Sequence, residues 1–467
     1  VGYGLKSKKI DGNDIFEVMD AIQEARNSAL KGDPVLIEAM TFRMRGHEEA
    51  SGTFYVPDEL FEEWKEKDPL LRVENRLLKS RAVLEKQEID KIRKRVKSKF
   101  ETELEQALTA AEPVFNPERE LSDAGFIRTH QTATTTSPNF SQSPRKEKRF
   151  IDGIRSALLQ AFEEEPGFLM MGQDIAEYGG VFKVTEGFLE TFGKERIRNT
   201  PIIESGIIGT AIGLSLEGFL PVVELQFADF ISCGFNQIVN NLSKGRYRWM
   251  PPLNVTIRAP HGAGVGAGPF HSQSPEGWFM SHPGLRIVVP GTVEDAQNML
   301  YTALYDPNPV LFFEHKKLYR SLKQPATDPC QLVDLEKAKV ILQGTDASII
   351  TYGLGLQWAL EIAGKYEKEG ISLEIVDLRS LAPLDYETIK QSAGKTSKIL
   401  LLQEPSQIMG PMSEIAAFLT EECFEFLDAP VIRCSSLDTP VPFNRQLEKG
   451  YLANYRLYEK LNRLLEY

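Results

Sequence analysis

Short apolar runs separated by helix-length segments fill the chain from Arg149 onward, and this alternation constrains the fold more than any other feature. The runs include FLMMG, LNVTI, LRIVV and VLFFE, followed in the last third by ASIIT, LEIVD and KILLL. Strands connected through helices pair in parallel, because the helix returns the chain to the same end of the sheet. We therefore expect an α/β fold with several parallel-sheet domains. A chain of 467 residues is also too long for a single hydrophobic core.

The region before Arg149 contains three differently patterned segments. Residues 1–72 show further strand and helix alternation, in which a helical segment ends at Gly32 and the apolar run PVLIEAMTF predicts a buried strand. Residues 73–111 carry alternating charges, which is typical of a solvated helix face. Residues 127–148 are rich in Thr, Ser, Gln and Pro without periodicity, and this composition predicts a mobile linker.

Composition and charge exclude several classes of protein. The net charge of −12 is unfavourable for a nucleic-acid surface, and acidic residues flank the basic stretch KIRKRVKSK. No apolar run approaches the roughly 18 residues that a transmembrane helix requires, so we expect no membrane segment. The four cysteines form no CxxC pair. They predict buried free thiols in a reducing cytoplasm.

Glu204 is a candidate functional carboxylate because it stands in TPIIESG, between apolar residues and a glycine. Carboxylates rarely occur in such a setting without a partner. The side chain can serve as a general acid, or its charge can complement the dipole at the N-terminus of a helix. The residues alone leave both interpretations open.

Two histidines are further candidates. His271 follows HGAGVGAGPF, in which glycine recurs at every second position from Gly262 to Gly268. Alternating glycines permit unusual dihedral angles and the close approach of another group. No Gly-Lys-Ser/Thr sequence follows, so we exclude a phosphate-binding P-loop. His271 is then either a hydrogen-bonded structural residue or a catalyst. His47, in FRMRGHEEASG, is a loop histidine if considered alone, with Arg43 as an ordinary surface charge.

Three segments together resemble the β subunit of thiamin-diphosphate-dependent 2-oxo acid dehydrogenases. They are IIESG at 202–206, QFADF at 226–230 and HSQSPE at 271–276. The strings GGVFKVTEGF, PGLRIVVPGT, HKKLYR and DTPVPFNRQLEKGYL extend the resemblance from about Phe150 to the C-terminal end. WKEKDPLLR resembles the end of the family's α subunit. The sequence thus resembles a fusion of α and β subunits of the branched-chain (2-oxoisovalerate) type, which implies a transketolase-like fold with a C-terminal α/β domain.

The resemblance implies thiamin diphosphate as the cofactor and suggests roles for particular residues. Glu204 matches the glutamate that hydrogen-bonds the aminopyrimidine ring. Ile202, Gln226 and Phe230 match apolar, amide and aromatic residues that line this ring. His271 matches a histidine that faces the thiazolium ring and the substrate, where it holds the 2-oxo acid carboxylate and moves protons during acyl transfer.

The α-like part carries the remaining matches. Arg43 and His47 match a segment near the cofactor diphosphate and the substrate channel. Glu48 stands where animal enzymes carry a phosphorylated serine, so we do not expect that regulation. The family's GDG…N motif for Mg²⁺ and the diphosphate is absent, and the chain does not begin with methionine. We therefore expect the Mg²⁺ ligands in an α segment upstream of Val1, and little activity from this chain alone.

The resemblance divides the chain into five expected segments. They are a remnant of the α diphosphate-binding domain at 1–75, a helical extension at 76–125, a linker at 126–148, the aminopyrimidine-binding domain at 149–328 and a transketolase C-terminal-like domain at 329–467. The implied reaction is oxidative decarboxylation of a branched-chain 2-oxo acid, with transfer of the acyl group to the lipoyl group of an acyltransferase component. A homodimer of fused chains is expected from the resemblance alone.

Other functions remain open at this point. Pyruvate and acetoin dehydrogenase components share the same skeleton. A transketolase-like transferase would need residues for sugar phosphates, and none is recognised around His271. The chain can also be a non-catalytic assembly module, because the last domain of the family docks on the acyltransferase core. The activity of an upstream-extended chain distinguishes the enzyme from the module.

Overall fold

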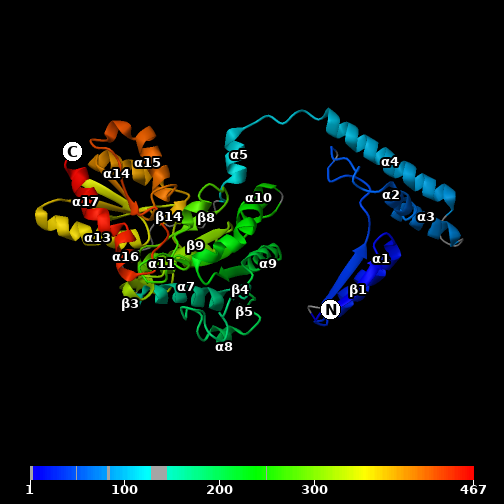
Figure 1. Cartoon of the computed structure of the whole chain (residues 1–467), viewed down its shortest axis with the longest axis horizontal. Coiled ribbons are helices and arrows are strands. Elements are labelled where there is room, and N and C mark those ends of the chain that lie inside the picture. Colours follow the sequence, from blue (N-terminus) through cyan, green and yellow to red (C-terminus); the bar gives the residue numbers. More distant parts are fainter. Residues whose placement is uncertain (1–3, 49, 81–84, 128–144, 249) are drawn as a thin grey trace. The chain divides into compact units, whose positions relative to one another are not determined.

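The computed structural model describes residues 4–48, 50–80, 85–127, 145–248 and 250–467. The chain forms two compact units, Val1–Phe115 and Asn116–Tyr467, each with its own secondary structure (Figure 1). Most of the linker expected at 126–148 lies outside the described residues. Its last part, 145–148, belongs to a strand instead.

The first unit combines a two-stranded parallel sheet with four helices among the described residues. In chain order its elements are β1 (Lys6–Asp11), α1 (Ile15–Ala29), β2 (Val35–Met40), α2 (Asp58–Lys65), α3 (Pro69–Lys79) and α4 (Lys86–Thr109). The side chain of Asp14 caps α1 by accepting hydrogen bonds from the amides of Phe16 and Glu17. The predicted strand PVLIEAMTF is confirmed as β2. Its predicted burial is wrong, because Leu36 and Met40 are exposed on this small sheet.

The first half of the second unit is built on a seven-stranded sheet of order β14-β8-β9-β7-β6-β4-β5, in which every pair is parallel except β14 with β8. The elements of this half are α5 (Pro117–Ala124), β3 (Arg145–Arg149), α7 (Phe150–Glu164), β4 (Phe168–Gly172), α8 (Phe188–Phe192), β5 (Ile197–Asn199), α9 (Glu204–Leu216), β6 (Leu220–Glu224), η2 (Ala228–Gly234), η3 (Gln237–Leu242), α10 (Gly245–Arg248), β7 (Thr256–His261), η4 (Glu276–Phe279), β8 (Arg286–Val288), α11 (Val293–Tyr305), β9 (Val310–His315), α12 (Leu318–Ser321) and β10 (Lys323–Thr327). Helices α7 and α11 pack on each other, and α9 packs against β6 and η2. As its spacing predicts, Thr292 caps α11 by accepting from the amide of Asp295 at 3.0 Å.

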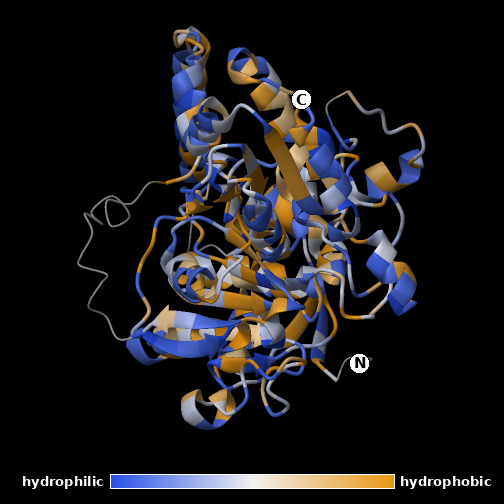
Figure 2. Ribbon diagram, turned by 90° about the vertical axis from the view of Figure 1, so that its left-hand side faces the viewer, coloured by the Kyte–Doolittle hydropathy of each residue, from blue (hydrophilic) through white to orange (hydrophobic). Residues whose placement is uncertain are grey.

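The second half is built on a five-stranded sheet of order β11-β13-β12-β15-β16, parallel except for β11. Its elements are β11 (Lys339–Leu342), β12 (Ala347–Thr351), α13 (Leu354–Tyr366), η5 (Glu367–Glu369), β13 (Leu373–Asp377), β14 (Ser380–Ala382), α14 (Tyr386–Thr396), β15 (Ile399–Ser406), α15 (Pro411–Glu422), η6 (Phe424–Phe426), β16 (Ile432–Ser436), α16 (Arg445–Tyr451) and α17 (Asn454–Leu465). Hydrophobic residues are concentrated along the interior strands (Figure 2). The predicted α/β fold with parallel sheets is confirmed.

Two smaller differences separate the structure from the expectations. Residues 145–148 form β3, which pairs antiparallel with β10, although their composition suggested a linker. Cys330, Cys423 and Cys434 are buried, but Cys233 is exposed, so the prediction of buried thiols is wrong at that position. Neither difference alters the sheet order.

The two halves of the second unit are joined by strand pairing and by buried polar contacts. Strand β14 leaves the second half and pairs with β8 of the larger sheet. Arg379 donates to Asp295 Oδ1 at 3.1 Å. Tyr352, after β12, donates from its hydroxyl group to Glu276 Oε1 at 3.0 Å. Burial raises the pKa of the Glu276 carboxyl to about 7.

The raised pKa of Glu276 makes stability depend on pH. The unfolded carboxyl ionises near pH 4.5 while the folded one stays protonated to about 7. Stability from this group is therefore complete below pH 4.5 and is lost as the pH rises through 7, by on the order of 3 kcal/mol. We expect Glu276→Gln to remove this part of the pH dependence in urea unfolding measured between pH 4 and 8. The exposed Glu361→Gln variant serves as the control, and an unchanged slope in Glu276→Gln would contradict the assignment.

Candidate functional site

The candidate residues of the second unit lie where parallel strands of the seven-stranded sheet end. Gln173 and Asp174 follow β4, Gln226 follows β6, and the loop that carries His271 follows β7. Parallel strands present their carboxyl ends at one edge of a sheet, and ligands of open α/β sheets bind outside that edge. The fold thus gathers these segments although they are far apart in sequence.

Glu204 is the first residue of α9, and its side chain is only 7% exposed. The amide of Gln173 donates from Nε2 to Glu204 Oε1 at 3.1 Å. The N-terminus of a helix favours a negative charge, so the position of Glu204 agrees with the helix-dipole interpretation. It does not exclude the interpretation as a general acid. Ile202, two residues earlier, is 85% exposed. An apolar side chain this exposed beside a buried carboxylate leaves surface for another group to cover.

Gln226 is held by Asp174, which follows Gln173 in the sequence. Its Nε2 donates to Asp174 Oδ2 at 3.1 Å, and Asp174 has a φ of 57°. The pair Gln173–Asp174 therefore contacts both predicted residues. Sequence reasoning assigned no functional role to this pair.

An aromatic cluster surrounds His271. The ring centroid of Phe230 lies 5.6 Å from that of His271, and that of Phe227 lies 4.8 Å away. Both rings meet the imidazole edge to face, an arrangement that aromatic rings favour. The structure thus brings the predicted Phe230 and His271 together. Phe227 was missed, although it belongs to the same QFADF segment.

The glycine-rich loop approaches other groups as closely as its sequence predicts. Its four alternate glycines all have φ between 73° and 91°, which side chains rarely adopt. A Cβ at Gly262 would lie 2.1 Å from His315 Nε2, and a Cβ at Gly268 would lie 2.3 Å from the ring of Phe443. The amide of Gly262 donates to the carbonyl of Gln273 at 3.1 Å and closes the base of the loop.

A fully buried ion network lies beneath this edge. The guanidinium of Arg258 in β7 binds Glu314 of β9 through two hydrogen bonds of 2.6 and 2.8 Å, and also binds Glu224 at the end of β6. Tyr319 donates to Glu314 Oε2 at 2.7 Å. Burial alone would lower the pKa of Arg258, but the two carboxylates hold it above the usual value. Burial raises the pKa of Glu224. The network links three neighbouring strands just before the segments that carry the candidate residues.

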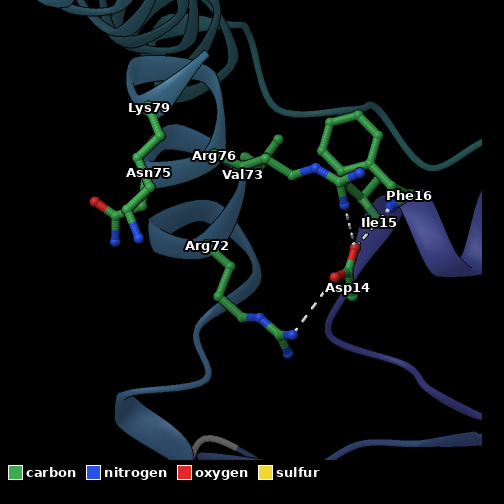
Figure 3. A pocket seen from close by; sticks show the side chains of 8 residues that line it. All are labelled: Asp14, Ile15, Phe16, Arg72, Val73, Asn75, Arg76 and Lys79. Carbon is green, nitrogen blue, oxygen red and sulfur yellow. Dashed lines mark hydrogen bonds and ion pairs between the residues drawn. The ribbon is translucent and has the colours of Figure 1, made fainter.

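Arg43 and His47 belong to the first unit, where both are exposed in the segment after β2. A hollow of about 390 Å³ in this unit is lined by residues of the α1 N-terminus and of α3 (Figure 3). Its two arginines already have partners: Arg72 pairs with Asp11 and Asp14, and Arg76 lies 4.1 Å from the ring of Phe16. The hollow includes neither predicted residue.

Two kinds of site are absent from the described residues. No group of three or more His, Cys, Asp and Glu side chains is arranged there to hold a metal ion. No helix in the described part of the chain is long and apolar enough to cross a membrane.

Comparisons with known proteins cover most of the chain. The family model of the dehydrogenase E1 component matches residues 1–116. The pyrimidine-binding domain of transketolase matches residues 146–321, and the transketolase C-terminal domain matches residues 336–456. The E1 match ends before the segment predicted as a linker, the pyrimidine-binding match begins within the last three residues of that segment, and the C-terminal match follows it.

Individual relatives agree with these matches. The chain is 43% identical over 310 residues to a 2-oxoisovalerate dehydrogenase subunit beta of Bacillus subtilis (strain 168), covering 65% of this chain and 94% of the relative. It is 39% identical over 322 residues to a pyruvate dehydrogenase E1 component subunit beta of the same organism, covering 68% and 98%. A solved structure described as a split gene transketolase, inactive beta4 tetramer, shares the fold with a TM-score of 0.55 and 24% identity, covering 68% of this chain and 98% of that one.

These matches extend the resemblance seen in IIESG, QFADF and HSQSPE to whole domains. The α-like segment and the β-subunit portion occur in one polypeptide. Oxidoreductases of this kind use thiamin diphosphate and a transketolase-like fold. The chain belongs to the family of 2-oxo acid dehydrogenase E1 components, with fused α-like and β parts.

Proposed function

We propose that this chain takes part in the thiamin-diphosphate-dependent oxidative decarboxylation of a branched-chain 2-oxo acid and passes the acyl group to the lipoyl group of an acyltransferase component. The observation that carries the proposal is the buried carboxylate of Glu204 at the carboxyl edge of the larger sheet. A carboxylate there can hydrogen-bond a protonated ring nitrogen, and its burial strengthens such a contact.

The residues at this edge fit the aminopyrimidine half of the cofactor. Glu204 would hold the ring nitrogen. Gln173 fixes the carboxylate of Glu204 by donating a hydrogen bond to its Oε1. The exposed Ile202 and the ring of Phe230 offer apolar surface to cover the pyrimidine. Gln226 offers an amide beside them. When bound, thiamin diphosphate supplies the nucleophile that attacks the 2-oxo carbon and accepts the electrons left by carbon dioxide.

His271 is proposed to act on the substrate side. Its imidazole packs edge to face against Phe227 and Phe230, and these contacts favour one orientation of the ring. A fixed imidazole can bind the substrate carboxylate and donate or accept a proton during acyl transfer. Arg43 and His47 are proposed to act at the diphosphate and the substrate channel.

Branched-chain acids are favoured by the 43% identity to a relative whose name specifies 2-oxoisovalerate. Pyruvate is the second candidate, because a pyruvate dehydrogenase subunit is 39% identical over a similar length. Mg²⁺ is proposed to accompany the diphosphate, and the described residues form no cluster that could hold it. The homodimer of fused chains, the cytoplasmic location and the five segment boundaries are likewise proposals.

Acceptor-coupled decarboxylation provides the first test. Branched 2-oxo acids and pyruvate would be compared with Mg²⁺ and thiamin diphosphate, using this chain and a version extended upstream with an α-subunit sequence. We expect activity only in the extended version and a higher kcat/KM for branched acids. Tight binding of Mg²⁺ and thiamin diphosphate by this chain alone would refute the prediction that the chain lacks the residues for Mg²⁺ and the diphosphate. No activity in either version would favour the assembly-module alternative.

Replacing Glu204 tests the role of the carboxylate. We expect Glu204→Gln in the active form to lower kcat by at least about 10²-fold, because a positioned proton-transfer partner contributes this much. Thiamin diphosphate affinity, measured by calorimetry, should fall as well. Glu217→Gln, an exposed position at the other end of α9, is the matched control. Activity of Glu204→Gln equal to that of the control would exclude the proposed role.

A further inference from the structure

The loop that carries His271 is held from outside by carboxylates of the second half of the unit. Glu404 of β15 accepts a hydrogen bond from the amide of Ala263 at 2.7 Å and from Ser274 Oγ at 3.2 Å. These two residues stand at opposite ends of the loop. Glu404 Oε2 also lies 2.6 Å from His315 Nε2. One side chain therefore holds both ends of the loop against the end of β9.

Glu448 of α16 holds the middle of the glycine-rich run. Its carboxylate accepts from the amide of Gly264 at 2.8 Å and from the amide of Gly266 at 3.1 and 3.2 Å. Backbone amides that converge on one side of a segment with positive φ values form a concave anion-binding nest. In this protein the nest holds an anion supplied by the chain itself, nearly two hundred positions further along the sequence.

A third carboxylate belongs to the QFADF segment. Asp229 accepts from the amide of Gln273 at 3.1 Å. The three carboxylates are each at most 6% exposed, so bulk water does not solvate their charges. They are Asp229, Glu404 and Glu448.

Lys316 supplies a positive charge to this group. The residue follows β9, is 5% exposed, and its Nζ has no hydrogen-bond partner among the residues that the structure describes. Burial lowers the pKa of Lys316 to about 8, and attraction by Asp229, Glu404 and Glu448 opposes that shift. Nζ also lies 5.6 Å from the ring of Phe227, which contacts His271. The ammonium group thus lies among the carboxylates and beside the aromatic cluster.

We propose that Glu404 and Glu448 are positioning residues that fix the His271 loop, with Lys316 as their countercharge, so that the transketolase C-terminal domain takes part in organising the catalytic site. The proposal rests on the proposed function for the role of His271. The contacts themselves join the region matched by the pyrimidine-binding domain to the region matched by the C-terminal domain. A domain that only docks a partner would not need two buried carboxylates bonded to a loop of the other domain.

Hydrogen–deuterium exchange of the full chain, without cofactor or substrate, tests the contacts directly. We expect Glu448→Gln and Glu404→Gln to raise the exchange rate of amides 262–274 by about tenfold or more, the value of a hydrogen bond to a charged group. Glu448→Asp, which keeps the charge, should restore part of the protection. Glu374→Gln is the matched control: Glu374 is 2% exposed on β13 and bonds Ser392 and Lys395 instead of the loop.

The same variants are then assayed in the form of the enzyme that decarboxylates 2-oxo acids. We expect Glu448→Gln to lower kcat at least about tenfold while KM changes little, because the loop is displaced and the remaining binding surface is kept. Normal exchange in folded Glu448→Gln, or an equal rise in Glu374→Gln, would overturn the proposal. Fast exchange with unchanged kcat would overturn the positioning role. Failure of the proposed function would instead appear as inactivity of the unmodified enzyme, while the exchange result still stands.

Discussion

The buried guanidinium of Arg258 is the interaction on which the arrangement of the site depends. It joins β6, β7 and β9 through Glu224 and Glu314. These strands lead directly into QFADF, the glycine-rich loop and Lys316. A buried charge is tolerated only when its hydrogen bonds are satisfied. The paired and bidentate geometry therefore fixes the register of the three strands. It also fixes where QFADF, the glycine-rich loop and Lys316 begin.

Above this network, charged groups organise the carboxyl edge of the seven-stranded sheet more than apolar contacts do. The core of the sheets is apolar, yet the loop with His271 is held by carboxylates from three different elements. Alternating glycines make this possible, because they expose backbone amides that a side chain would cover. The sequence after the glycine run lacks the Gly-Lys-Ser/Thr of a phosphate-binding P-loop. The structure adds that the anion at the glycine run is Glu448.

Much of the fold could be predicted from the sequence. The runs FLMMG, VLFFE, ASIIT and KILLL are strands, and their helical connections make the sheets parallel. The capping role of Thr292 and the positive φ of the glycines also follow from local rules. The burial of β2 was wrong, because an apolar run does not reveal whether a second layer covers it. Residues 145–148 were misjudged because their pairing partner, β10, lies nearly two hundred positions further along the chain.

Some residues of the candidate site could be recognised from the sequence, and others could not. Glu204, Gln226, Phe230 and His271 were recognisable because each lies in a short segment typical of the family. Gln173, Phe227, Lys316, Glu404 and Glu448 were not, since their roles depend on contacts between segments that only folding brings together. The sequence by itself determined the order of strands and helices and the family, and it supplied the candidate site residues, because these follow from periodicity and local motifs. Only the tertiary structure decided which carboxylates hold the His271 loop, because hydrogen bonds between segments far apart in sequence leave no periodic pattern in the chain.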